Sequence, residues 1–417
     1  MSARVIAIIF MVVLSLVAAG CNGAKETDEV AYIVAMGLDA GQDGKLKVTY
    51  LVALPQAVGG QDSGKGGEKP PALLTFEGEN LAETRGLLNS SLSRTSILSH
   101  VKAIIIGEEL ARKGLARVTS PFMRYREYRG SMFLIVANRT TAQRLLSANK
   151  PIFETLQSKF FESMMLKSVD NSFFPRTNIH EFYVRLKSNS AAPIIALFGL
   201  NPGNGGHAVG EIMPPEKDAE YIAGAMPRQG GGGSVEAVGT AVFKGDKLVG
   251  LLTSEETRAM AIVHGDFDRG FVVVEDPLMP KENINCYIRL GSSPKIKVVM
   301  TDGRPVIDVT IKIEAEITSI GSGISYETGG YREQLEAQVS KVLEQQVTNM
   351  LIKTRDLQTD VVGFGYQARA CFPTYRDYMA VDWATLYGQA EFKVAVSTRV
   401  RRTGLMWRSS GMRPETQ

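Results

Sequence analysis

The sequence predicts a three-domain protein of α+β and α/β character, in which mixed sheets are covered by helices. Strand and helix patterns alternate between residues 30 and 148, as they do in an α/β layer structure. Residues 307–318 alternate between apolar and polar side chains, which is typical of a strand with one buried face. Residues 331–353 place apolar side chains three and four apart, as a covering helix does. At about 150 residues per domain, the 417 residues leave room for two or three domains.

The first 20 residues predict a bacterial lipoprotein signal peptide. Arg4 supplies a positive charge, Val5–Val17 is an apolar core too short to span a bilayer, and the small residues Ala18-Ala19-Gly20 come directly before Cys21. We therefore expect lipidation of Cys21, with a membrane anchor of two or more acyl chains. A plain secretory peptide or an N-terminal membrane anchor with an incidental cysteine is the alternative. After the signal, no apolar run approaches the length of a second membrane helix.

Charge and cysteine content limit the further possibilities. A net charge of +3 is too small to imply a nucleic acid partner. With Cys21 assigned to the lipid, Cys286 and Cys371 have one possible pairing, and both a disulfide and two isolated buried thiols are open. Arginines cluster near the C-terminus, where they could attract anionic lipid heads, although a solvated tail is the preferred interpretation: Arg399, Arg401, Arg402, Arg408 and Arg413.

An N-terminal α/β domain is predicted over residues 21–150. Its predicted strands are 30–38, 46–54, 73–76, 101–106 and 132–137. Its predicted helices are 80–93, 108–125 and 141–148. Residues 59–71 hold no apolar side chain to bury and are expected to form a mobile loop.

A middle α+β domain is predicted over residues 151–280. Helix patterns at 153–166 and 179–187 precede glycine-rich stretches at 201–215 and 230–234. A hairpin of strands 236–243 and 248–252 follows, then a helix that Thr253 and Glu256 begin as a capping box, and a strand at 271–275.

A C-terminal domain is predicted over residues 281–405, followed by a tail at 406–417. The strand at 307–318 is expected to pair with strands 284–290, 296–300 and 392–400 in an antiparallel sheet. The helix at 331–353 is expected to cover one face of that sheet.

The residues give no positive sign of catalysis. The four histidines, His100, His180, His207 and His264, lie far apart and in no metal-ligand spacing. The glycines of residues 199–206 lack a Walker lysine, and no nucleophile-elbow pattern occurs. We therefore expect no catalytic residue, no metal and no cofactor.

Several stretches together resemble one known family. They are Gly239–Gly250 (GTAVFKGDKLVG) running into Glu255–Arg258 (EETR), Ser99-His100 leading to Ile105–Ala111, Asp360–Gly365 (DVVGFG), and Arg401–Gly404. With the lipoprotein signal, they identify the chain as similar to the Ger(x)C family, the C-subunit lipoproteins of spore nutrient germinant receptors.

The resemblance implies a non-enzymatic receptor subunit on the outer face of the inner spore membrane. It implies a complex with a polytopic A subunit and an integral-membrane B subunit, with amino acids or sugars as ligands of the whole complex. It supplies no ligand-contacting residue that can be carried onto this sequence. The alternative is a solute-binding lipoprotein of a transporter. That class needs two similar α/β lobes around a cleft, and the last third of this sequence looks unlike the first.

Overall fold

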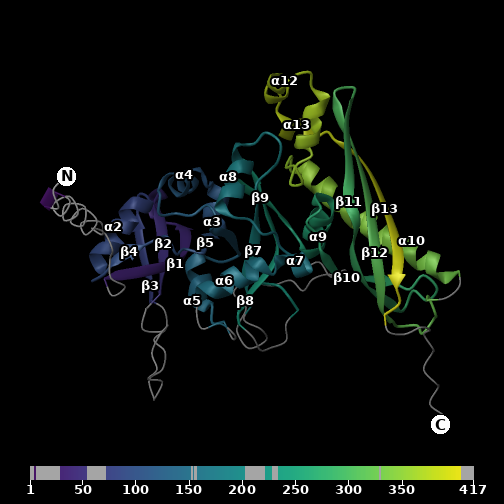
Figure 1. Ribbon diagram of the computed structural model, residues 1–417, viewed down its shortest axis with the longest axis horizontal. Helices are drawn as coiled ribbons and strands as arrows, with labels where there is room; N and C mark the ends of the chain where they lie inside the picture. The colour runs from purple at the N-terminus through teal and green to yellow at the C-terminus, as the bar shows by residue number, and fades with distance from the viewer. Residues whose placement is uncertain are drawn as a thin grey trace, which may run out of the picture.

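The computed structural model describes residues 4–5, 29–53, 72–151, 154, 157–201, 221–227, 233–327 and 330–404, and these residues form two sheets with helices packed on them (Figure 1). The predicted signal peptide, the loop at 59–71, most of the two glycine-rich stretches and the tail at 406–417 lie outside the described residues. Among the described residues, no helix is both long and apolar enough to cross a membrane.

The larger, N-terminal sheet holds nine strands of the described chain, in the order β3-β2-β1-β5-β6-β7-β8-β9, with β4 paired to β1. They are β1 (Val30–Ala40), β2 (Leu46–Ala53), β3 (Ala72–Gly78), β4 (Thr95–Ile97), β5 (Ala103–Gly107), β6 (Phe133–Asn138), β7 (Ile194–Leu200), β8 (Val235–Lys244) and β9 (Lys247–Leu252). The strands β1, β5, β6 and β7 run parallel to one another, and β2, β3, β8 and β9 add antiparallel pairs at the two edges.

Helices cover both faces of this sheet. They are α2 (Leu81–Ser91), α3 (Glu108–Lys113), α4 (Ala116–Arg124), α5 (Ala142–Ala148), α6 (Gln157–Leu166), α7 (Ser168–Asn171) and α8 (Ile179–Lys187). On β5, Ile104 packs in the core under α4 and α8, while Ile105 packs in the core under α5 and α6. All five residues of β5 are therefore buried, which is why its sequence is a continuous apolar run.

The helix predicted at 108–125 is two helices. Gly114 lies between α3 and α4 with φ of 122°, a backbone conformation that ends a helix and that glycine adopts without a steric penalty. The chain turns there, and α4 starts against the β8–β9 turn, where the amide of Ala116 donates to Asp246 at 2.9 Å.

The N-terminal sheet continues across residue 151. Strands β7, β8 and β9, from the predicted middle domain, are hydrogen-bonded into it. The strand predicted at 271–275 is instead part of the second sheet, where it pairs with β11. The predicted domain borders at 150 and 280 stay predictions. Strands that are distant in sequence pair within one sheet, so membership of a sheet does not follow the predicted borders.

The C-terminal sheet has the order β10-β11-β12-β13. Its elements and neighbours are α9 (Ser254–His264), β10 (Arg269–Glu275), β11 (Asn283–Thr301), β12 (Arg304–Ile320), α10 (Tyr331–Asp356), α11 (Gly365–Ala368), α12 (Tyr375–Met379), α13 (Trp383–Tyr387) and β13 (Glu391–Arg402). The predicted strands 284–290 and 296–300 are one long strand with register shifts between them. Asp302 and Gly303 close the β11–β12 hairpin with φ of 49° and 75°, the signs that a type I′ turn needs.

The prediction of a wholly antiparallel C-terminal sheet was wrong for its last strand. β10, β11 and β12 are antiparallel, but β13 runs parallel to β12 from Val306–Glu391 onward. The cause is the connection, because α10 crosses over the sheet and returns the chain to the end where β12 began.

The predicted covering helix is confirmed. The apolar side chains of α10 are buried: Leu335, Val339, Leu343, Val347, Met350 and Leu351. They pack in one core with the inward residues of β12, namely Ile307, Val309, Ile311 and Ile313. The other face of the sheet is uncovered in the described chain, where Phe271 is 61% exposed and Val273 57% exposed.

Cys286 and Cys371 are both free thiols. Cys286 lies fully buried on the covered face of the sheet, and burial raises the pKa of its thiol to about 12. The partly exposed Cys371 donates to the carbonyl of Val298 at 3.3 Å.

Alkylation of the native protein at pH 8 should modify Cys371 and spare Cys286, because a thiol must ionise to react and Cys286 is both inaccessible and protonated. Peptide mass spectrometry after brief iodoacetamide treatment, with and without urea, measures this. Equal labelling of both cysteines in the native state, or a Cys286–Cys371 crosslink, would contradict it.

Candidate functional site

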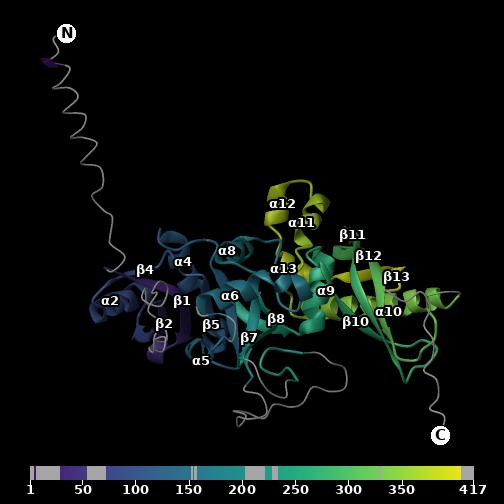
Figure 2. The same cartoon turned by 60° about the horizontal axis from the view of Figure 1, so that its bottom comes forward.

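The motif that runs from β8 to α9 forms part of the junction between the two sheets. In Figures 1 and 2, α9 lies between the N-terminal sheet and the C-terminal sheet. The predicted capping box begins α9, since the amide of Thr253 donates to Glu256 at 2.9 Å and the amide of Glu256 donates back to Thr253 at 3.5 Å. The hydroxyls of Thr240 on β8 and Thr257 on α9 are 2.8 Å apart and buried.

Charged side chains of α9 then fasten it to the C-terminal sheet and its helix. Glu256 pairs with Lys353 of α10 at 2.6 Å. Arg258, only 4% exposed, donates to the carbonyl of Phe271 on β10 at 2.8 Å and to Gln346 of α10 at 3.0 Å. Burial lowers the pKa of Arg258, and nearby Glu255 opposes that shift. A buried guanidinium must keep its hydrogen-bond partners, so these bonds restrict how the parts can move.

The Asp360–Gly365 motif forms the second half of the junction. The Asp360 carboxylate accepts hydrogen bonds from the amides of Gly363 at 2.7 Å and Gly365 at 2.8 Å, and from the indole of Trp383 at 2.8 Å. Its own carbonyl accepts from the amide of Ala192, just before β7, at 2.7 Å. Burial raises the pKa of Asp360, although the three hydrogen bonds to its carboxylate oppose the rise.

Gly365 leaves no space for a side chain. A β-carbon there would lie 2.6 Å from the α-carbon and carbonyl oxygen of Ser190. The chain after α10 thus passes directly against the loop before β7, and only glycine permits this approach. The stretches Glu255–Arg258 and Asp360–Gly365, which carry part of the family resemblance, therefore hold the two sheets together.

A cavity of about 440 Å³ lies beside this junction. Arginines, acidic side chains and a histidine line it: Arg176, Glu181, Arg185, His264 and Asp266. Arg185 is committed to the carbonyls of Ala192 and Val361, at 3.0 and 2.9 Å. His264 hydrogen-bonds to Asp266 at 2.8 Å, which lowers the pKa of that carboxyl group.

The described histidines belong to no cluster of metal-ligating side chains. Within the described ranges, no group of three or more histidine, cysteine or acidic side chains could hold a metal ion. His100 packs edge-on against Tyr32, with ring centroids 4.9 Å apart, and His207 lies outside the described residues.

The predicted lipidation site, Cys21, also lies outside the described residues, but the structure shows where the chain following it joins the fold. The carbonyl of Glu29 accepts from the amide of Thr95 at 2.9 Å, and Val30 pairs with Thr95 of β4. The N-terminal segment therefore enters beside β4 and α2.

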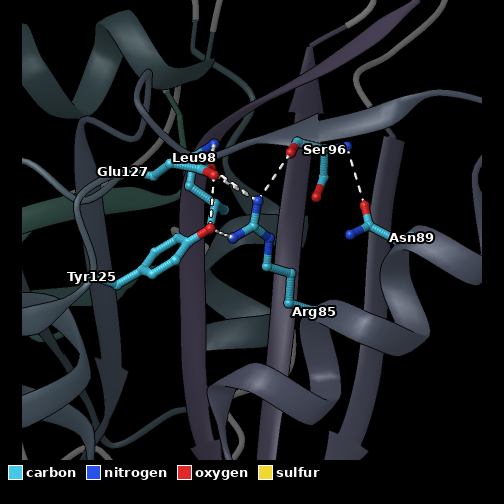
Figure 3. Close-up of polar contacts among 6 residues, drawn as sticks. All are labelled: Arg85, Asn89, Ser96, Leu98, Tyr125 and Glu127. Atoms are coloured by element: carbon cyan, nitrogen blue, oxygen red, sulfur yellow. Dashed lines mark hydrogen bonds and ion pairs between the residues drawn. The ribbon is translucent and has the colours of Figure 1, made fainter.

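A polar cluster that the sequence analysis missed stabilises this corner (Figure 3). Arg85 of α2 donates to both carboxylate oxygens of Glu127, at 3.0 and 2.9 Å, and to the hydroxyl of Tyr125 at 2.6 Å. It also reaches the carbonyl of Ser96 at 3.4 Å, and Glu127 accepts from the amide of Leu98 at 3.3 Å. The cluster joins α2, β4 and the turn after α4.

Burial alone would raise the pKa of Glu127, but the hydrogen bonds from Tyr125 and Arg85 outweigh it and hold the pKa below its ordinary value of 4.5. A cavity of about 420 Å³ opens beside the cluster between α2 and α4, and Leu81, Pro121 and Tyr128 are among its lining residues.

Gly365→Ala should destabilise the protein by about 1–3 kcal/mol, because a methyl group must be forced against the backbone of Ser190. Urea denaturation measures the change in the unfolding midpoint. Gly330→Ala is the matched control, since a β-carbon at Gly330 meets nothing within 4 Å. Equal midpoints for the two variants would refute the close contact.

Glu127→Gln should lower the free energy of unfolding by about 1 kcal/mol at neutral pH, because it removes the charge that Arg85 binds at a partly exposed site. Because folding lowers the pKa of Glu127, its carboxylate stabilises the folded state at pH values above the pKa of the unfolded chain, and this stabilisation is lost as the pH falls. The difference in stability between parent and variant should therefore shrink below about pH 4.5. Thermal unfolding between pH 3 and 8 measures it, with Glu109→Gln, at an exposed ion pair, as control. A difference that does not vary with pH would contradict the assignment.

Comparison with protein families gives two matches, one to each part of the chain. Residues 23–200 match the spore germination protein N-terminal domain, and residues 238–404 match the spore germination B3/GerAC-like C-terminal domain. The two matches together cover most of the chain and both sheets.

Individual relatives match over nearly the whole length. Spore germination protein KC of Bacillus subtilis strain 168 is 24% identical over 95% of each chain, and spore germination protein B3 of the same strain is 22% identical over 95% of this chain and 97% of that one. The crystal structure of the GerBC protein has a TM-score of 0.53 at 22% identity, covering 88% of this chain and 98% of that chain. This protein belongs to the Ger(x)C family, the C subunits of spore germinant receptors.

Proposed function

We propose that this chain is a non-enzymatic lipoprotein subunit of a spore nutrient germinant receptor, that it docks on the integral-membrane A and B subunits, and that germination signalling requires it. The observation that carries this proposal is the match to spore germination proteins across both sheets and the junction between them. Two of the stretches that carry the resemblance, Glu255–Arg258 and Asp360–Gly365, hold the two sheets together, which favours a scaffold that presents surfaces to partners.

Cys21 is proposed as the membrane anchor, on the outer face of the inner spore membrane. The signal pattern before it supports this. Cys21 lies eight positions before Glu29 in the sequence, a distance that an extended chain covers in at most about 28 Å. A lipid on Cys21 would therefore hold the β4 corner of the N-terminal sheet close to the membrane surface.

The solute-binding alternative is not favoured by the architecture. A transporter lipoprotein of that class closes two similar α/β lobes around its solute. In the described chain, one sheet has nine strands with helices on both faces, and the other has four strands with one open face. The two bodies are unlike, and buried hydrogen bonds of Asp360 and Arg258 fix the connection between them.

Spores that lack this chain should lose the germination response to a subset of amino acids or sugars. Cys21→Ala should reduce both that response and the amount of the protein in the inner-membrane fraction. Germination across a nutrient panel, with fractionation of a tagged protein, measures both. Normal germination with impaired uptake of one solute would favour the transporter lipoprotein. An unchanged distribution of Cys21→Ala would refute the anchor.

A further inference from the structure

Four arginines gather where the chain enters the N-terminal sheet. Arg94 directly precedes β4, Arg124 is the last residue of α4, and Arg126 and Arg129 follow in the turn after α4. Glu127 joins this turn to the residue directly after β4 by accepting from the amide of Leu98, and Arg85 contacts both Glu127 and Ser96 of β4 (Figure 3). We call Arg94, Arg124, Arg126 and Arg129 the arginine corner.

The charges of the arginine corner are not neutralised by the described part of the protein. Arg124, Arg126 and Arg129 are exposed, Arg94 is half-buried, and no ion pair among the described residues includes any of them. Several other basic side chains of this sheet and its helices have an acidic partner: Arg85 with Glu127, Lys102 with Glu162, Arg112 with Glu108 and Lys113 with Glu109. Arg117 of α4 is exposed and, like the arginine corner, has no ion pair among the described residues.

The position of the arginine corner in the fold favours a membrane surface as its binding partner. It borders the point where the chain from Cys21 joins the sheet, at most about 28 Å of extended chain away. Tyr125, 41% exposed, stands between Arg124 and Arg126, and tyrosine is enriched at the headgroup level of membranes. Exposed arginines attract anionic lipid headgroups across about a Debye length, roughly 8 Å at physiological salt.

We propose that the arginine corner binds the phosphate headgroups of anionic lipids in the membrane that holds the anchor. That the arginine corner lies at the membrane surface depends on the proposed lipidation of Cys21. The affinity of the corner for anionic lipid does not depend on it. The anchor holds the chain to the membrane at one point, and the corner fixes which side of the N-terminal sheet faces that membrane.

The test is sedimentation of the mature, unlipidated chain, residues 21–417 with Cys21→Ala, with phosphatidylglycerol vesicles and with phosphatidylcholine vesicles. We expect binding to phosphatidylglycerol only, weakening as salt rises. Each basic residue near such a surface contributes about fivefold in affinity, so the triple variant R124Q/R126Q/R129Q should bind about a hundredfold more weakly.

The matched control is R304Q/R399Q/R402Q, which removes the same charge from exposed positions on β12 and β13. It should bind phosphatidylglycerol like the parent. Equal losses in both triple variants, or no binding by the parent, would overturn the proposal. Unchanged vesicle binding by R124Q/R126Q/R129Q, with lost co-purification of an integral-membrane subunit, would overturn it too and assign the corner to a protein partner. Failure of the anchor is scored separately, by the mass of the N-terminal peptide from native membranes.

Discussion

The position of the two sheets relative to each other depends on the buried carboxylate of Asp360. It stands where α10 has ended, and it orders the following turn by accepting from Gly363, Gly365 and Trp383. A carboxylate taken out of water must be compensated by such donors, so the turn has little freedom to rearrange. Gly365 can then lie against Ser190, while Arg258 holds α9 to β10 on the other side of the junction. The two unlike sheets are thereby held as one body.

Much of the fold could be predicted from local patterns, because burial on one face imposes a period on the sequence. The alternation in β12 and the three-and-four spacing in α10 gave both elements and their packing. What local patterns do not encode is which strands pair and in which direction. Strands β7 to β9 join a sheet begun more than 150 residues earlier, and the parallel direction of β13 follows from the crossover of α10.

The candidate site was predictable to the same limited degree. Asp360, Gly365 and Arg258 all lie in the stretches that carry the family resemblance. Their role at the junction comes from contacts with Ser190, Trp383 and Phe271, which lie outside those stretches. Arg85 and Glu127 are 42 residues apart, and no spacing rule connects them. Cys21 could be predicted because a signal peptidase reads local sequence, and that prediction waits for a direct measurement.

The central claim is that this chain works as a subunit of a membrane receptor. The most direct test is affinity purification of the tagged full-length chain from detergent-solubilised inner membranes of spores, followed by protein identification. The account predicts that a polytopic A subunit and an integral-membrane B subunit co-purify with it. Recovery of the chain alone, or with the membrane components of a solute transporter, would contradict the account.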